Sequence, residues 1–211
     1  MTITRRTFGL GLGALGLSAC TNVTSAPSAS LATNGTLPDD LRPAPNPAYD
    51  AWVAAFRPRA AAQGLTEATL EAGFRGTGYL PGVVTRDRNQ TEFSRTLEDY
   101  LAIAASNERV TKGRAAHARH RDTLNALQAR YGVDTTIITA IWGLESMYGE
   151  RRGDVPVVSA TSTLAFDGRR GAFFESQLVA ALKILQSGDT TPARLVGSWA
   201  GAMGHTQFIP T

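Results

Sequence analysis

The stretch of sequence that most restricts the fold is residues 134–149, DTTIITAIWGLESMYG, because it carries signals for both ends of a helix. The side chain of Asp134 can accept backbone N–H groups that are unpaired at a helix start. Gly149 can end the helix in a left-handed conformation. Four side chains between these ends recur at helical spacing and share one side: Ile138, Ile141, Trp142 and Glu145. We therefore predict a helix of about fourteen residues.

Glu145 is the one acidic side chain in this apolar row. Burial among apolar groups would disfavour its charged form and raise its pKa, so that the proton stays available for a general acid. The alternative is a structural role, in which Glu145 lies at the edge of the row and reaches water or pairs with an arginine. Periodicity alone does not decide between the two.

The rest of the chain predicts a mainly α fold. The 211 residues, 43% of them hydrophobic, suit one domain with a sufficient core. Periodicity and end signals predict six further helices, at residues 47–64, 66–73, 92–105, 109–131, 171–187 and 192–196. Thr66 can cap the second of these helices, and Gly132 stops the helix at 109–131. Two glycine-containing segments, residues 76–89 and 150–170, are predicted to be loops or connectors.

The first nineteen residues predict an export signal. Arg5 and Arg6 precede an apolar, glycine-rich run that is too short to span a bilayer. The paired arginines indicate either twin-arginine export or the basic start of a general secretory signal. The sequence LSAC ending at Cys20 resembles a bacterial lipobox, which predicts a lipidated Cys20; ordinary signal-peptidase cleavage is the alternative. Residues 20–45 would then be the lipidated cysteine with a flexible tether, and residues 46–211 the folded domain.

Charge gives little sign of a nucleic-acid partner. Removing residues 1–19 leaves 19 basic and 18 acidic side chains, so we expect no nucleic-acid binding. The basic helix at residues 109–131 could face an anionic polymer or simply be solvated. Its His117 and His120 have no further ligands in register, which favours surface histidines over a metal site.

The last segment, residues 197–211, contains three glycines and two alanines among polar side chains. Such a composition lets the backbone approach another helix or a ligand closely. Ser198 and Gln207 can hydrogen-bond to hydroxyl and amide groups. Tight internal packing is the alternative explanation of this segment.

Several motifs together resemble the lytic murein transglycosylase B family. They are AIWGLES at residues 140–146, TLAFDGRR at 163–170, GSWAGAMG at 197–204 and QFIP at 207–210. The resemblance implies a lysozyme-like, mostly helical catalytic domain that cleaves the bond between N-acetylmuramic acid and N-acetylglucosamine in peptidoglycan. It implies that Glu145 is the single catalytic acid/base, with no cofactor and no metal. It also places Ser198, Met203 and Gln207 in the motif of the glycan-binding groove.

By this resemblance, Glu145 would protonate the leaving oxygen and then deprotonate the muramic C6 hydroxyl, giving a 1,6-anhydro product. Two alternatives remain at this stage. One is a hydrolytic muramidase, for which Glu175 or Asp167 would be wanted as base. The other is a non-catalytic peptidoglycan-binding lipoprotein, because family members continue beyond residue 211 and the chain is expected to be C-terminally truncated.

The expected location is the bacterial periplasm, where the N-terminal lipid would anchor the protein to a membrane. Thr21 follows Cys20 in place of the Asp that commonly signals inner-membrane retention, so the outer membrane is expected. The expected partners are therefore peptidoglycan glycan strands and the membrane.

Overall fold

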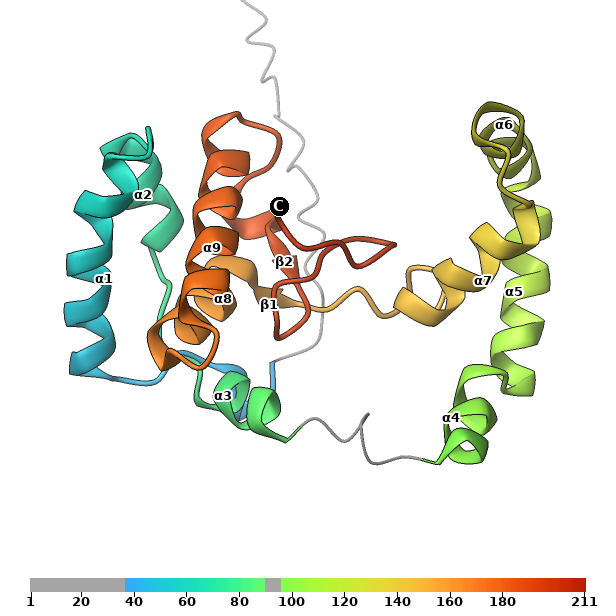
Figure 1. Ribbon diagram of the computed structural model, residues 1–211, viewed down its shortest axis with the longest axis horizontal. Coiled ribbons are helices and arrows are strands. Elements are labelled where there is room, and N and C mark those ends of the chain that lie inside the picture. Colours follow the sequence, from blue (N-terminus) through green and yellow to red (C-terminus); the bar gives the residue numbers. More distant parts are fainter. Residues whose placement is uncertain (1–36, 90–95) are drawn as a thin grey trace, which may run out of the picture. The chain divides into compact units, whose positions relative to one another are not determined.

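The computed structural model describes residues 37–89 and 96–211, and the predicted mainly α fold is confirmed there (Figure 1). The helices are α1 (Pro47–Ala61), α2 (Glu67–Phe74), α3 (Pro81–Arg88), α4 (Leu97–Ala104), α5 (Asn107–Arg119), α6 (Arg121–Tyr131), α7 (Thr135–Ser146), α8 (Val157–Asp167) and α9 (Gly171–Gln186). Short 3-10 turns lie at η1 (Asp39–Leu41) and η3 (Pro192–Arg194), and β1 (Val155–Pro156) pairs antiparallel with β2 (Val196–Gly197).

Several predictions concern residues outside this described part. They are the export signal at residues 1–19, the lipidated Cys20, most of the tether, and the start of the helix predicted from residue 92. Within residues 37–89 and 96–211, no helix combines the length and apolar character needed to cross a membrane.

The main core forms where α8 packs against α9, with α1, α2 and α3 also in contact with α8. Phe56 of α1, Leu70 of α2 and Leu182 of α9 are fully buried in one cluster with Val157 of α8. A second cluster joins Leu80, before α3, to other residues of α8 and α9. The central position of α8 explains why its residues from 157 to 165 are all buried.

The prediction that residues 150–170 form a connector is wrong over about half of that range, because α8 (Val157–Asp167) is a regular helix. Burial on every side removes the polar face by which an amphipathic helix is recognised. The helix tolerates its many hydroxyl groups because they are hydrogen-bonded. Thr161 Oγ1 donates to the Val157 carbonyl at 2.7 Å, and Ser162 Oγ lies 2.7 Å from the hydroxyl of Tyr49. Burial raises the pKa of Tyr49 to about 12.

The prediction of a loop at residues 76–89 is also wrong in the second half of that range, where α3 forms. Pro81 occupies the first turn of α3, where its missing N–H costs nothing, and Val83 is fully buried. Near its end, the side chain of Asp87 is only 1% exposed. The sequence pattern misses α3 because its burial depends on partners about eighty residues further along the chain.

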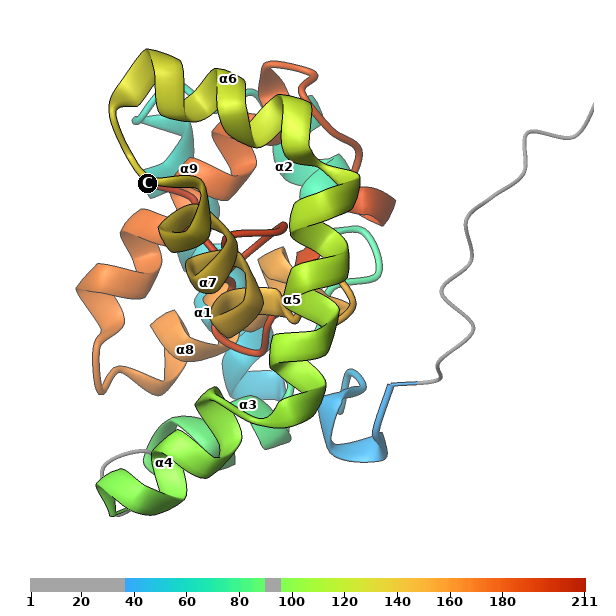
Figure 2. The same cartoon turned by 90° about the vertical axis from the view of Figure 1, so that its right-hand side faces the viewer.

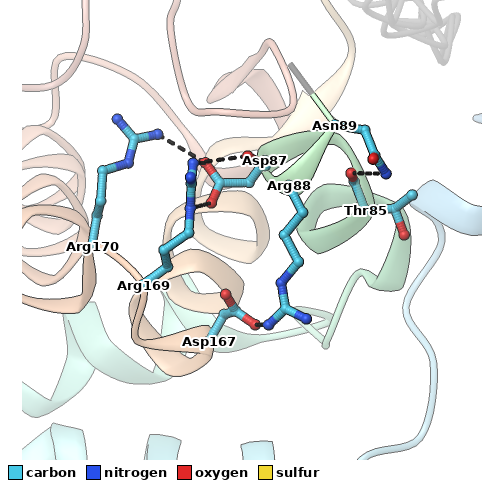
Figure 3. Close-up of polar contacts among 7 residues, drawn as sticks. All are labelled: Thr85, Asp87, Arg88, Asn89, Asp167, Arg169 and Arg170. Atoms are coloured by element: carbon cyan, nitrogen blue, oxygen red, sulfur yellow. Dashed lines mark hydrogen bonds and ion pairs between the residues drawn. The ribbon is translucent and has the colours of Figure 1, made fainter. Parts of the chain in front are cut away.

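Those partners are two arginines in the turn between α8 and α9 (Figure 3). Arg169 donates from Nε to Asp87 Oδ2 at 2.6 Å and from Nη2 to Oδ1 at 2.9 Å, and Arg170 Nη2 donates to Oδ1 at 2.9 Å. These bonds lower the pKa of Asp87. We call Asp87, Arg169 and Arg170 the Asp87 clamp. Beside it, Arg88 Nη2 donates to Asp167 Oδ1 at 2.6 Å. Three ion pairs therefore tie α3 to the end of α8 and the turn that follows it.

The remaining helices follow the predictions with shifted ends. The helix predicted at residues 109–131 is broken at His120 into α5 and α6. Gly132 ends α6 as predicted, and its backbone is left-handed. The capping role of Thr66 at the start of α2 is confirmed, since its side chain accepts from Thr69 N. The helix predicted at 171–187 corresponds to α9, whereas only a 3-10 turn and β2 occupy residues 192–197.

Candidate active site

Helix α7 carries Glu145 in its last turn. Asp134 caps its start as predicted, accepting from Thr136 N at 2.7 Å. The helix ends at Ser146, three residues before Gly149, because Met147 and Tyr148 already adopt left-handed backbone angles, with φ of 49° and 57°. Each such non-glycine residue costs about 1–2 kcal/mol. This turn directly follows Glu145, so contacts elsewhere must hold it in place.

Of the two positions considered for Glu145, burial among apolar groups is wrong, because its side chain is exposed. The buried face of α7 is instead a row of small residues, Thr139, Gly143 and Ser146, on the side that packs against α5. Glu145 lies off this row, and Ile141 is also about half exposed. Within the described part of the chain, the Glu145 carboxylate has no ion pair or hydrogen bond. It is therefore open to a ligand from solvent.

Tyr148 holds the turn after Glu145 against α5. Its hydroxyl donates to the Arg109 carbonyl at 2.9 Å, and burial raises its pKa. The ring fills the space beside Gly113 of α5 and Gly143 of α7, where an added Cβ would overlap the phenol. The two glycines thus let α5 and α7 enclose this ring. Figure 2 shows the two helices side by side. This arrangement stabilises the strained turn.

The segment of residues 197–211 is attached to the same end of α7. Ser146 Oγ donates to the His205 carbonyl at 2.6 Å, and Trp142 Nε1 donates to His205 Nδ1 at 3.0 Å. Two motifs that are about sixty residues apart in sequence therefore meet beside Glu145. The sequence carries no signal that marks His205 as a site residue, since a single histidine in an irregular segment belongs to no periodic pattern and to no motif of metal ligands or catalytic residues.

Ser198, Met203 and Gln207 all take part in the internal structure of this segment. Ser198 Oγ accepts from the backbone N–H of Ala202 at 3.1 Å. Gln207 Nε2 donates to two backbone carbonyls, that of Arg152 at 3.1 Å and that of Gly204 at 2.9 Å. Met203 packs partly against the main core. The Ser198 hydroxyl proton and Gln207 Oε1 form no hydrogen bonds within the described residues.

The two other carboxylates considered from sequence are each engaged by an arginine. Glu175 accepts from Arg59 Nε at 3.2 Å and from Arg59 Nη2 at 2.9 Å. Asp167, whose side chain is 10% exposed, pairs with Arg88 as described above. Glu145 differs from both in being exposed and unpaired within the described residues.

The Trp142–His205 hydrogen bond gives a direct test of the attachment between α7 and the 197–211 segment. We expect His205→Ala to lower the free energy of unfolding by about 1 kcal/mol, because the indole N–H loses its acceptor. The rate at which the Trp142 indole proton exchanges with solvent, measured by NMR, should rise. His205→Asn supplies an amide oxygen near the position of Nδ1 and should restore the protection of the indole proton from exchange. The indole protons of Trp52 and Trp199 serve as internal controls. Unchanged exchange in His205→Ala would contradict this attachment.

Comparison with known proteins agrees with this arrangement. Residues 48–211 match the family model described as the Transglycosylase SLT domain. Membrane-bound lytic murein transglycosylase B of Escherichia coli K12 is 36% identical over 94 residues, which are 44% of this chain and 26% of that protein.

Solved structures from Pseudomonas aeruginosa are also similar. SltB3, in complex with NAG-NAM-pentapeptide, has a TM-score of 0.74 and 45% identity over 78% of this chain and 44% of that one. The soluble lytic transglycosylase SltB1 has a TM-score of 0.70 and 30% identity over 75% of this chain and 54% of that one. The chain thus spans about a quarter of its curated relative and about half of these solved structures.

This likeness confirms the lysozyme-like fold class predicted from the sequence. The family match covers both segments that meet beside Glu145. The chain therefore belongs to the Transglycosylase SLT domain family.

Proposed function

We propose that this chain is a peptidoglycan lytic transglycosylase that cleaves the β-1,4 bond between N-acetylmuramic acid and N-acetylglucosamine. Its relatives carry the name lytic transglycosylase, and SltB3 has been solved with NAG-NAM-pentapeptide. The observation that carries the proposal is the junction of α7 with residues 197–211, made by His205 with Trp142 and Ser146. It sets an exposed carboxylic acid beside a segment rich in glycine and polar side chains.

In the first step, Glu145 in its acid form donates its proton to the glycosidic oxygen. The bond from that oxygen to muramic C1 breaks, and its electron pair leaves with the oxygen. Positive charge develops at C1, where the N-acetyl group of the substrate assists. Proton donation lowers the activation free energy of this cleavage, because the leaving group departs as a neutral hydroxyl and not as an alkoxide.

In the second step, the Glu145 carboxylate takes the proton of the muramic C6 hydroxyl as O6 bonds to C1. The product carries a 1,6-anhydro ring, Glu145 is again an acid, and no water is consumed. Ordinary glycosidases need a second carboxylate as nucleophile or base. Here the nucleophile belongs to the substrate, which agrees with Glu175 and Asp167 both being engaged by arginines.

For substrate binding, we propose that Ser198 and Gln207 contact the sugars. The hydroxyl proton of Ser198 and Oε1 of Gln207 remain for this after their internal bonds. Met203 would supply an apolar surface beside them. These contacts would orient the muramic residue so that its C6 hydroxyl can reach Glu145.

We also propose that residues 1–19 direct export and that Cys20 is lipidated, which would anchor the domain of residues 46–211 in the periplasm at the outer membrane. The name of the curated relative describes it as membrane-bound. When cells that express the Cys20→Ser variant are fractionated, we expect to find the variant in the soluble fraction, whereas the unmodified protein should be in the membrane fraction. Retention of that variant in the membrane would contradict the anchor.

Mass spectrometry of soluble products tests the reaction. Residues 21–211 would be incubated with purified peptidoglycan, and we expect muropeptides with a 1,6-anhydro end, each lighter by one water than a reducing-end product. Reducing-end products would establish a hydrolytic muramidase instead. Binding of the polymer without any cleavage would establish a binding protein and overturn the proposed activity for this chain.

A further inference from the structure

A small pocket opens between α5 and α7, within one helical turn of Glu145. Its volume is about 160 Å³, well below the roughly 300–1,000 Å³ of pockets that hold drug-sized ligands. Polar and aromatic side chains dominate its lining: Lys112, Arg119, His120, Trp142, Tyr148 and Glu150. A pocket of this size and composition suits a single charged group with a few carbon atoms.

Among the described residues, the charged side chains around the pocket include one arginine without an ion pair. Lys112 Nζ lies 2.9 Å from Glu108 Oε1 and 2.6 Å from Glu150 Oε2, so this lysine is paired twice. Arg119, at the end of α5, forms no ion pair within the described residues and is exposed. An incoming anion would therefore meet Arg119, whose planar guanidinium can bind a carboxylate through two parallel hydrogen bonds.

Trp142 links the pocket to the candidate active site. Its indole lines the pocket, and the ring of His120 packs edge-on against it at 5.2 Å between centroids. Trp142 also lies three residues before Glu145, which places both side chains on neighbouring positions of one side of α7. The pocket therefore adjoins the position at which a substrate would meet Glu145.

We propose that this pocket binds a carboxylate of the peptidoglycan stem peptide through Arg119, with Trp142 against the adjoining carbon atoms. The inference rests on the proposed function. The stem peptide branches from the muramic residue, and its side chains and C-terminus carry carboxylates, whereas the sugar hydroxyls are neutral. The pocket would make recognition of peptide-bearing glycan stronger than recognition of the bare strand.

Binding of two matched ligands tests the proposal by isothermal titration calorimetry. The ligands are GlcNAc-MurNAc-pentapeptide and the same molecule with its peptide carboxylates converted to amides. All proteins span residues 21–211 and carry Glu145→Gln to prevent turnover. We expect Arg119→Ala to weaken binding of the carboxylate form by about tenfold and leave the amide form unchanged, the loss typical of one charged hydrogen-bonded pair.

Arg114→Ala is the matched control, because Arg114 lies on the same helix, outside the pocket lining, and the substitution removes the same charge. Arg114→Ala should bind the carboxylate form as tightly as the protein that carries Glu145→Gln alone. Arg119→Lys should retain part of that affinity. Equal losses in Arg119→Ala and Arg114→Ala, or equal losses for both ligands, would overturn the proposal. Absence of cleavage by the unmodified chain would count against the proposed function alone, since these titrations do not require turnover.

Discussion

We expect Glu145→Gln to reduce cleavage of purified peptidoglycan by about three orders of magnitude, within the 10²- to 10⁴-fold range typical of general acid–base groups. One carboxyl group gives a proton in the first step and takes one in the second, so an amide fails at both. Because Glu145 is exposed, the substitution should change the free energy of unfolding by less than about 0.5 kcal/mol. Release of anhydro-muropeptides measures the rate, and co-sedimentation with the polymer measures binding, which should persist.

Glu175→Gln is a suitable control because it also converts a glutamate to its amide. It loses the pair with Arg59 but lies outside the proposed mechanism, so its cleavage rate should stay close to that of the unmodified chain. A strong loss in Glu175→Gln would favour a two-carboxylate hydrolase. Full activity in Glu145→Gln would remove Glu145 from its proposed role.

Local signals in the sequence were sufficient for the parts of the fold that depend on neighbouring residues. They predict the cap at Asp134, the cap at Thr66 and the helix end at Gly132, since each depends on hydrogen bonds or backbone angles within one turn. The sequence also predicts helix α9, because one face of this helix is buried and the other is solvated. The spacing of its apolar residues therefore follows the helical period.

What could not be predicted depends on distant partners. Helix α8 has no exposed face to give a pattern, and α3 is fixed by arginines about eighty residues away. The periodicity of α7 favours Ile138, Ile141 and Trp142 as its packed face, and the burial of Glu145 that this face would imply is wrong. The packed face of α7 is a row of small residues that accommodates Tyr148, and small residues carry little weight in a hydrophobic periodicity.

The largest stability effect is expected in the Asp87 clamp, where Arg169→Ala should lower the free energy of unfolding by about 3 kcal/mol. The substitution removes both side-chain bonds from Arg169 to the carboxylate and a third bond to the Asp87 carbonyl at 2.8 Å. Asp87 would remain buried with only Arg170 to compensate its charge, and breaking a buried pair in this way typically costs 3–5 kcal/mol. For a chain of this size the melting temperature should fall by roughly 6–12 °C.

Arg59→Ala provides the comparison, because Arg59 also makes two bonds to one carboxylate, but Glu175 is 28% exposed and can return to water. Its cost should be about 1 kcal/mol or less.

Acid should reduce the cost of Arg169→Ala. The clamp lowers the pKa of Asp87, so the unfolded chain binds protons more readily, and the stabilisation is present above the unfolded pKa of about 3.9 and is lost as the pH falls through the lower folded value. The difference in melting temperature between the unmodified chain and Arg169→Ala should therefore narrow as the pH falls from about 5 to about 2. A difference that stays constant over this range would show that Arg169 stabilises the turn by packing alone, without help from the charge of Asp87.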